Sequence, residues 1–311
     1  MSKSPASLSQ SLKRLALRSG ADLVGVASIS RFDQAPVEAH PRSIFAQTRS
    51  VVVLACRMLR GSLKTIEDGT YWQAYNCDSY QYINEVVAPH ILRQLTLWLE
   101  DQGFTSVPLH NPFLLGAGRP VRPGGVSPDV AINLRLAACA AGLGEIGLSG
   151  LLLTPQFGPR QRLMALITDA PLKADPLLAP GTVCDRCGLC RRSCPGQAIP
   201  PEHNGRAVIA GRTYPFSQVD RAKCRPAHQG WDKRFSPFLT EDSMPQNPPE
   251  YYRFLDQRFN QRSICGGRGC IRACLDHLEK TGRIRQTFVT PLIDQPPWEL
   301  DAPAEAREQH P

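Results

Sequence analysis

The sequence lacks any long apolar segment. No run approaches the roughly 18 consecutive apolar residues that a membrane-spanning helix needs. The segment from Met1 to Gly20 has neither the apolar core nor the small-residue cleavage site of a secretory signal. We therefore expect a cytoplasmic protein without a membrane partner.

The composition is that of a folded globular protein. Of the 311 residues, 42% are hydrophobic and 21% are charged, which argues against a disordered chain. This length allows one large domain or two modest ones, each with a real core. The formal net charge of +8 would suit a polyanionic partner, but charge alone is weak evidence for nucleic acid.

The first half alternates helix-like and strand-like segments. The spacing of Leu8, Leu12, Leu15 and Ala16 predicts an amphipathic helix within residues 1–20. Short β-branched or aliphatic runs predict buried strands at Asp22–Ser28, Ser50–Cys56 and Leu163–Thr168. Longer patterns predict helices at Asp78–Gln102, divided or kinked by Pro89, and at Pro128–Ala141. This alternation predicts an α/β sandwich.

Cysteines are unevenly distributed along the chain. Only Cys56, Cys77 and Cys139 precede residue 180, and the other eight lie between residues 184 and 274. With the Pro-rich stretch Ala170 to Pro180, this change predicts a boundary near residue 175. We expect an α/β cofactor and substrate domain (1–175), a cysteine-rich domain (176–284) with a hairpin at Arg206–Tyr214, and a disordered tail (285–311).

The first cysteine cluster has a specific spacing. Cys184, Cys187, Cys190 and Cys194, followed by Pro195, form the pattern C-x2-C-x2-C-x3-C-P of bacterial ferredoxins. Three thiolates on a tight loop can bind three corners of one [4Fe-4S] cluster, and the following helix carries the fourth thiolate to another cluster. Zinc is the alternative metal, but its sites usually combine two separated pairs of ligands.

A second group of cysteines supplies the remaining ligands. It comprises Cys224, Cys265, Cys270 and Cys274. By the same exchange of the fourth ligand, we predict that Cys274 joins Cys184, Cys187 and Cys190 at cluster 1. Cluster 2 would then be held by Cys194, Cys224, Cys265 and Cys270. The alternative is that Cys224 is only a buried thiol and that the second cluster is incomplete or absent.

Glycines accompany the second group of cysteines. Gly266, Gly267 and Gly269 are expected to adopt positive φ and to bring backbone N–H groups close to cluster sulfur. Of the remaining cysteines, Cys56 and Cys139 lie in apolar segments and are expected to be buried packing residues. The pattern around Cys77 leaves its role open.

Three stretches carry a family resemblance. Ala141–Gly147 (AGLGEIG), Leu151–Arg160 (LLLTPQFGPR) and Ile167–Leu172 (ITDAPL) precede the ferredoxin motif. Together with the cysteines, this block resembles the epoxyqueuosine reductases and the corrinoid-dependent reductive dehalogenases, over roughly residues 1–280. The resemblance implies an N-terminal corrinoid-binding-like α/β sandwich that holds cobalamin, followed by a bacterial ferredoxin-like domain with two [4Fe-4S] clusters.

The resemblance also implies site residues. Gly142, Gly144 and Gly147 would contact the cofactor, although glycines after a helix serve equally as a stop and tight turn. Leu148 and Ser149 stand where these families usually have Lys or Arg with Asn or His. Asp129 is the candidate general acid, with stabilisation of a helix N-terminus as its alternative role. A phenolic acid, as in dehalogenases, is the other option, and the candidates are Tyr71, Tyr75, Tyr80 and Tyr82.

These inferences predict an iron–sulfur oxidoreductase that passes single electrons to a cobalamin cofactor and reduces a small organic substrate. Its electron donor would be of ferredoxin or flavodoxin type. The alternatives are a corrinoid-free electron-transfer protein and a tRNA-modifying enzyme similar to the epoxyqueuosine reductases. The sequence shows neither the C-terminal helical-repeat region of those enzymes nor the twin-arginine signal of exported dehalogenases. We therefore expect tRNA not to be a partner.

Overall fold

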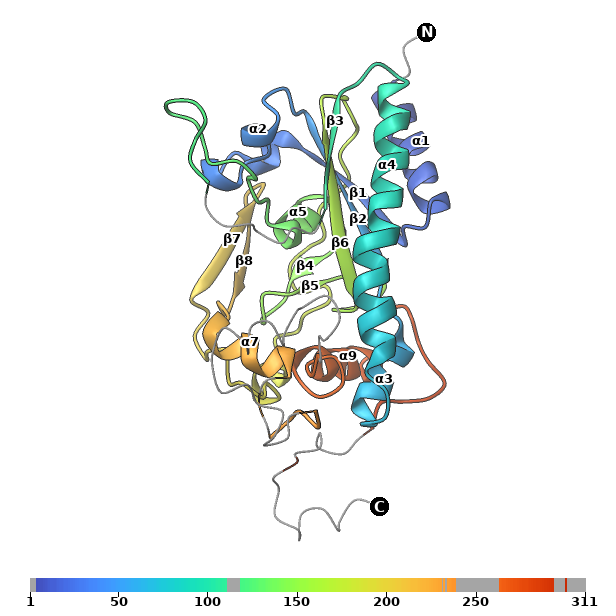
Figure 1. The fold of residues 1–311 in the computed structure, drawn as a ribbon, viewed down its shortest axis with the longest axis vertical. Coiled ribbons are helices and arrows are strands. Elements are labelled where there is room, and N and C mark those ends of the chain that lie inside the picture. The colour runs from blue at the N-terminus through green and yellow to red at the C-terminus, as the bar shows by residue number, and fades with distance from the viewer. Residues whose placement is uncertain are drawn as a thin grey trace.

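A four-stranded antiparallel sheet forms the centre of the protein (Figure 1). The computed structural model describes residues 4–110, 118–230, 232, 234–238, 263–293 and 300. The strand order is β1-β2-β6-β3, and the strands are β1 (Leu23–Ser28), β2 (Ser50–Arg57), β3 (Ser106–Leu109) and β6 (Gln161–Thr168). The three strands that the sequence predicts are thus confirmed, and β2 pairs with β6 along its whole length.

Helices cover both faces of this sheet. Val52 and Leu54 of β2 pack with α1 (Pro5–Arg18) and α4 (Ala88–Glu100), which lie side by side in Figure 1. Val51 and Val53 face the opposite side and pack with α5 (Leu134–Ala140). Because successive strand residues point to opposite faces, a continuous Val run suits a strand that is buried on both. The mixed α/β class is confirmed.

The long helix predicted around Pro89 is two segments. A π-helical segment, η3 (Ala74–Val87), leads directly into α4, and Pro89 occupies the first turn of α4. Proline has no N–H group and its ring clashes with the carbonyl group four residues earlier, so a regular α-helix cannot pass through it. The prediction that Pro89 divides this region is confirmed, although the helical segment begins before Asp78. Helix α3 (Arg60–Glu67) precedes it.

The helix predicted at Pro128–Ala141 is wrong in its first half. Helix α5 begins at Leu134, where the Asn133 side chain accepts hydrogen bonds from the N–H groups of Arg135 and Leu136. Asp129 is exposed and has φ +59°, outside the helix. Its alternative role as a helix N-terminal residue is therefore wrong, because Asn133 has that role.

The cysteine-rich part consists of short elements that share cores with the sheet region. The elements are β4 (Glu145–Ile146), β5 (Leu152–Leu153), α6 (Leu189–Arg192), β7 (Gly205–Ile209), β8 (Arg212–Phe216), α7 (Arg221–Gln229) and α9 (Cys270–Lys280). The predicted β7–β8 hairpin turns at Ala210-Gly211, both with positive φ. Ile209 and Tyr214 belong to the core around α5, so the boundary near residue 175 stays a prediction.

A third core joins α3 to α9. It contains Leu63 and Ile66 of α3, Leu153 of β5, and Leu275 and Leu278 of α9. Two buried or nearly buried ion pairs connect the same helices: Arg60 with Glu279 at 2.8 Å, and Arg272 with Glu67 at 2.6 Å. These contacts fix α9, which carries two cysteines, against the sheet region.

The start of the predicted tail is packed against the body. Arg285 donates its N–H to the carbonyl of Pro155 (2.8 Å), Leu292 is buried, and the N–H of Ile293 donates to Glu67. Residues 285–293 therefore differ from the disordered tail that we expect. Apart from Leu300, the remainder of the predicted tail lies outside the described residues. Short helical turns also occur at Ile29–Phe32, Val37–Ala39 and Pro41–Ile44. Among the described residues, no helix combines the length and apolarity needed to cross a membrane.

Candidate metal centres and the adjoining interior

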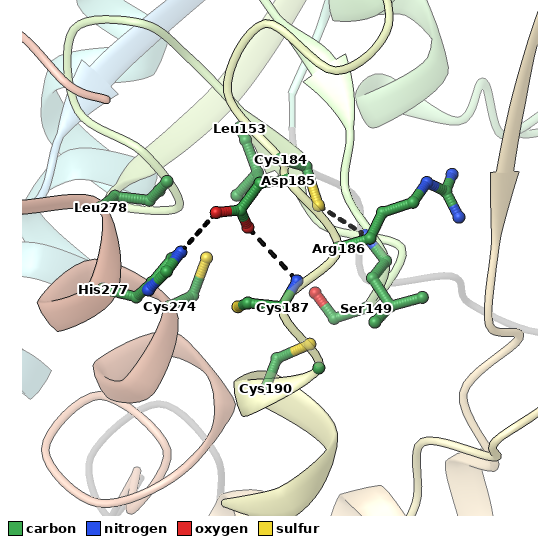
Figure 2. Close-up of a pocket in the computed structure, with 12 residues that line it drawn as sticks. Ser149, Leu153, Cys184, Asp185, Arg186, Cys187, Cys190, Cys274, His277 and Leu278 are labelled. Carbon is green, nitrogen blue, oxygen red and sulfur yellow. Dashed lines mark hydrogen bonds and ion pairs between the residues drawn. The ribbon is translucent and has the colours of Figure 1, made fainter. Parts of the chain in front are cut away.

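Four cysteine thiols surround one pocket (Figure 2). The pocket is lined by Cys184, Cys187, Cys190 and Cys274 together with Leu148, Ser149 and His277. Three of these thiols come from the loop that enters α6, and the fourth comes from α9. Gly188, with φ +76°, turns the chain between Cys187 and Cys190 and begins α6. We call Cys184, Cys187, Cys190 and Cys274 the first thiol group.

The other four cysteines of this region form a second thiol group: Cys194, Cys224, Cys265 and Cys270. Burial, together with the neighbouring Cys270 and Cys194, raises the pKa of Cys224 to about 11. A hydrogen bond to Cys270, burial, and the nearby Cys224 and Cys194 raise the pKa of Cys265. Mutual effects of this kind require short distances, so these four thiols lie together.

Similar effects act on Cys190 of the first thiol group. Burial, together with the nearby Cys270, Cys184 and Cys187, raises the pKa of Cys190 to about 12. The structure places the first thiol group around one pocket and the second thiol group near it, with Cys270 close to Cys190. The division of the eight thiols between two clusters stays a prediction. Their role as iron ligands stays a prediction. A bound metal would compensate the charge of the thiolates that ligate it.

Backbone N–H groups donate to sulfur in both groups. Leu148 donates to Cys184 Sγ at 3.4 Å, and Ala198 donates to Cys194 Sγ at 3.3 Å. The sequence predicts such bonds from the glycines near Cys265 instead. Gly266, Gly267 and Gly269 do not adopt positive φ, so that expectation is wrong. A Cβ at Gly267 would lie 2.3 Å from the backbone N of Glu67, so this glycine allows close packing against α3.

Glu145 orders the loop that enters the first thiol group. Its carboxylate is 2% exposed and accepts backbone N–H groups from Gly181 (2.7 Å), Val183 and Cys184 (3.0 Å). Buried polar groups need such partners, and here a single side chain satisfies three donors within residues 181–184 of an irregular segment. The sequence gives only one signal for this role, a carboxylate inside an apolar Gly-rich block.

Asp185 connects the same loop to α9. Its carboxylate lies 2.7 Å from His277 Nε2 and accepts the N–H of Cys187 at 3.2 Å (Figure 2). Arg283 Nε is 3.5 Å from the same carboxylate. Since Cys184 and Cys187 flank Asp185, and Cys274 precedes His277 by one helical turn, this contact holds the two sources of the first thiol group together.

The three glycines predicted to contact a cofactor have packing roles. A Cβ at Gly142 would lie 2.2 Å from the carbonyl oxygen of Pro176, and one at Gly144 would lie 2.2 Å from that of Leu153. A Cβ at Gly147 would come within 2.7 Å of the Leu153 side chain. These contacts support a tight turn. Cofactor contact at these positions, like a catalytic role for the exposed Asp129, stays a prediction.

The tyrosines near η3 have different environments. Tyr71 and Tyr82 are exposed and Tyr75 is buried in the third core. Tyr80 is half-buried, and the Cζ atom of Arg162 lies 4.1 Å from the centre of its ring. Nε and Nη2 of Arg162 are buried and have no hydrogen-bond partner among the described residues. Sequence reasoning missed Arg162, which begins β6 and is far from Tyr80 in the chain.

Arg135 lies near Arg162. Burial, together with the nearby Arg162 and Arg135, lowers the pKa of His228 to about 4, so this histidine is neutral at pH 7. The exposed Arg135 donates to the carbonyl of Gly150 at 3.1 Å and also lowers the pKa of Cys224. Arg162 and Arg135 therefore bring positive charge to the second thiol group. Buried donor atoms without a partner are unfavourable, so Nε and Nη2 of Arg162 suit a bound anionic or strongly polar group.

Curated sequence relatives are reductive dehalogenases, although no family model matches the chain. A tetrachloroethene reductive dehalogenase of Desulfitobacterium hafniense is 39% identical over 82 residues, which are 26% of this chain and 15% of that protein. The corresponding enzyme of Sulfurospirillum multivorans is 26% identical over 241 residues, covering 66% of this chain and 43% of that protein. The chain spans less than half the length of these relatives.

Solved structures with similar folds belong to two groups of enzymes. A reductive dehalogenase described as B12-dependent aligns with a TM-score of 0.53 and 19% identity, over 96% of this chain and 41% of that chain. An epoxyqueuosine reductase aligns with a TM-score of 0.50 and 16% identity, over 92% of this chain and 69% of that chain. In sequence the chain is similar to reductive dehalogenases, and in fold it is similar to reductive dehalogenases and to an epoxyqueuosine reductase, the two families that the sequence resemblance names.

Proposed function

We propose that this chain is an iron–sulfur reductase that holds two [4Fe-4S] clusters and passes single electrons through them to a bound corrinoid. The observation that carries this proposal is the way two helices share the two thiol groups. Cys190 at α6 serves the first group and Cys194, four residues later, serves the second. On α9 the order is reversed, with Cys270 in the second group and Cys274 in the first.

This exchange places the two groups side by side. Because residues four apart lie on one face of a helix, α9 extends from one thiol group to the other through Cys270 and Cys274. The chain makes the same passage from Cys190 in α6 to Cys194, two residues after this helix ends. Cys270 raises the pKa of Cys190, so the groups are close enough to influence one another electrostatically. Adjacent clusters are what single-electron transfer requires. A lone zinc ion would use four of these thiolates and leave the others as buried, mutually repelling groups.

Unpartnered polar atoms near Arg162 support the corrinoid part of the proposal. Arg162 Nε and Nη2, and the hydroxyl of the buried Ser217, have no hydrogen-bond partner among the described residues. A Cβ at Gly150 would lie 3.8 Å from the carbonyl oxygen of Ser217, and the carbonyl of Gly150 accepts from Arg135. These residues would hold the polar periphery of the cofactor. When bound, a corrinoid supplies strong reducing power at its metal, beside the second thiol group.

The substrate class we propose is a small organohalide, in keeping with the dehalogenase relatives. Two electrons and one proton replace a halogen by hydrogen, so the carbon–halogen bond breaks, a carbon–hydrogen bond forms and halide leaves. Tyr80 would donate the proton from its hydroxyl. The Arg162 guanidinium packs against its ring, with Cζ 4.1 Å from the ring centre, and would hold the side chain in place. The surrounding cations would also stabilise the departing halide.

Anaerobic purification with metal analysis tests the proposal. We expect about eight irons per chain with matching sulfide, and a shifted cobalamin spectrum with co-elution after reconstitution with hydroxocobalamin. Iron and sulfide without any corrinoid binding would support the alternative of a corrinoid-free electron carrier. Zinc without acid-labile sulfide would contradict both.

A further inference from the structure

Positive charge is concentrated around the thiol groups. Between residues 184 and 230 the chain has eight Arg or Lys residues and three Asp or Glu residues, a net charge of +5 (8 − 3) out of +8 for the whole sequence. The basic residues are Arg186, Arg191, Arg192, Arg206, Arg212, Arg221, Lys223 and Arg225. This segment also contributes five of the eight grouped cysteines.

Thiols and cations face opposite directions on these elements. Cys190 and Cys194 are 7% and 8% exposed, whereas Arg191 and Arg192 between them are exposed. On α7, Cys224 is only partly exposed and Lys223 beside it is exposed. Each short helix therefore directs its cysteine toward a thiol group and its cations toward solvent.

The segment after α6 packs closely against α7. A Cβ at Gly196 would lie 2.5 Å from the carbonyl oxygen of Lys223 on α7. Arg192 folds back, so that its Nη1 would lie 3.0 Å from a Cβ at Gly188, next to Cys187. We call the surface formed by Arg186, Arg191, Arg192 and Lys223 the basic face.

Few carboxylates neutralise the basic face. Asp185 is engaged with His277 and Arg283, and Asp220 accepts the first N–H groups of α7. Within the part of the chain that the structure describes, no ion pair involves Arg191 or Arg192. The guanidinium groups are thus available to a partner.

We infer that the basic face docks an acidic one-electron carrier protein of flavodoxin or ferredoxin type. The inference rests on the proposed function, because it needs clusters behind this face. The partner gives up one electron and a cluster gains it, with no bond made or broken. Such encounters use small interfaces, and complementary charge raises their association rate.

The position of the basic face favours an electron carrier over a nucleic acid. Arg186 lines the same pocket as Cys187 and Cys190, and Arg191 and Arg192 directly follow Cys190 in the chain. Electron transfer requires closeness to that group, whereas binding of a phosphate backbone does not. An acidic protein that docks here would bring its redox centre to the point where electrons must enter.

Stopped-flow reduction of the anaerobically purified protein tests the inference. The double variant Arg191→Glu/Arg192→Glu should lower the association rate with a fully reduced flavodoxin at low salt by about 10-fold or more. The rate for the unmodified protein should fall with ionic strength, and the variant should lose this dependence. A second variant, Arg191→Glu/Lys223→Glu, leaves Arg192 beside the cysteine loop untouched. It should show the same slower association and the same loss of salt dependence.

Two controls separate docking from cluster damage. Arg14→Glu/Arg18→Glu changes equal charge on exposed residues of α1, at the other end of the molecule (Figure 1), and should leave the flavodoxin rate within about 2-fold, because surface charges this far apart are screened. Reduction by photoreduced 5-deazariboflavin, an uncharged small molecule, should be equal in all variants.

Each other outcome overturns a specific claim. Equal flavodoxin rates in all proteins, or rates independent of salt, would overturn the docking inference while iron content and deazariboflavin reduction still support the proposed function. Absence of iron, or of any reduction by deazariboflavin, would overturn the proposed function itself. The basic face would be assigned to nucleic acid instead if bulk tRNA bound in a salt-dependent way, if Arg191→Glu/Arg192→Glu abolished this binding, and if the flavodoxin rates were unchanged.

Discussion

Buried cysteines occur in two settings in this protein. In the sheet region, Cys56 and Cys139 each lie alone in a separate core among aliphatic side chains. Burial raises the pKa of Cys56 to about 12 and that of Cys139 to about 11. Between α6 and α9, burial raises the pKa of Cys190 by a comparable amount, but other thiols surround it.

The difference lies in the neighbours rather than in the burial. A single buried thiol is a small apolar group that needs no partner. Four thiols in contact repel one another once any of them ionises, and only a metal makes that arrangement favourable. Packing chemistry therefore characterises the sheet region and ligand chemistry the thiol region. The predictions below test where this division holds.

The largest effect is expected at Tyr80, where the two regions meet. Tyr80→Phe removes only the hydroxyl and keeps the ring that faces Arg162. Loss of a proton donor should lower the turnover of a small organohalide by about 10²- to 10⁴-fold. Tyr82→Phe, an exposed position on the same segment, is the control and should keep its rate. Equal turnover in both variants would exclude Tyr80 as the donor.

A pair of cysteine substitutions compares the two regions directly. Cys190→Ala should remove the first cluster and leave about four irons per chain, because one ligand of four is lost. Cys139→Ala should leave the iron content at about eight, since this thiol lies in the core around α5, outside both thiol groups. Iron and acid-labile sulfide assays give the readout. Unchanged iron in the Cys190 variant would contradict the proposed assignment.

Stability tests whether the regions depend on one another. Arg272 of α9 pairs with Glu67 of α3, and both side chains are at most 10% exposed. Arg272→Ala removes one partner of the buried Glu67 carboxylate, which keeps Lys64 and the N–H of Ile293, and should cost about 3 kcal/mol. Lys280→Ala, at a 48% exposed position on the same helix, should cost at most about 1 kcal/mol. Denaturant unfolding under anaerobic conditions measures both, and equal losses would argue against coupling through this pair.

Substitution of Glu145 should have a smaller effect, confined to the first cluster. Glu145→Ala removes the acceptor of three backbone N–H groups, and each donor left unsatisfied costs about 1–3 kcal/mol. We expect lower iron occupancy and an altered electron paramagnetic resonance signal for the first cluster alone. Glu145→Gln keeps one carbonyl oxygen at the same position and should retain most of the iron. A loss shared equally by both clusters would indicate general destabilisation.

Local patterns account for what the sequence predicts correctly. The Val-rich run of β2 and the effect of Pro89 depend on neighbouring residues. The predicted grouping of thiols follows from cysteines four residues apart, which is also local information. The extent of α5 was mispredicted because Pro128-Asp129 resembles a helix start, whereas Asn133 makes the actual cap.

The residues that sequence reasoning missed have distant partners. Glu145 satisfies N–H groups at residues 181–184, and Arg162 faces Tyr80 from another element. No period or spacing within one segment reports such contacts, because tertiary packing creates them. The glycines beside Cys265 show the opposite error. Their sequence suggested positive φ and backbone N–H groups near sulfur. Instead, the absence of a side chain at Gly267 allows α3 to pack against this position.

The smallest effect is expected in thiol labelling of the sheet region. With a pKa of about 11, about one in a thousand Cys139 thiols is ionised at pH 8, and the thiolate is the reactive form. Raising the pH increases this fraction about tenfold per unit until the pKa is reached. Iodoacetamide at pH 8 should therefore label the exposed Cys77 and leave Cys56 and Cys139 unmodified, as read by mass spectrometry. Labelling of Cys139 at the rate of Cys77 would show that the core around α5 opens readily, and the contrast between the two regions would then reflect rigidity as well as neighbours.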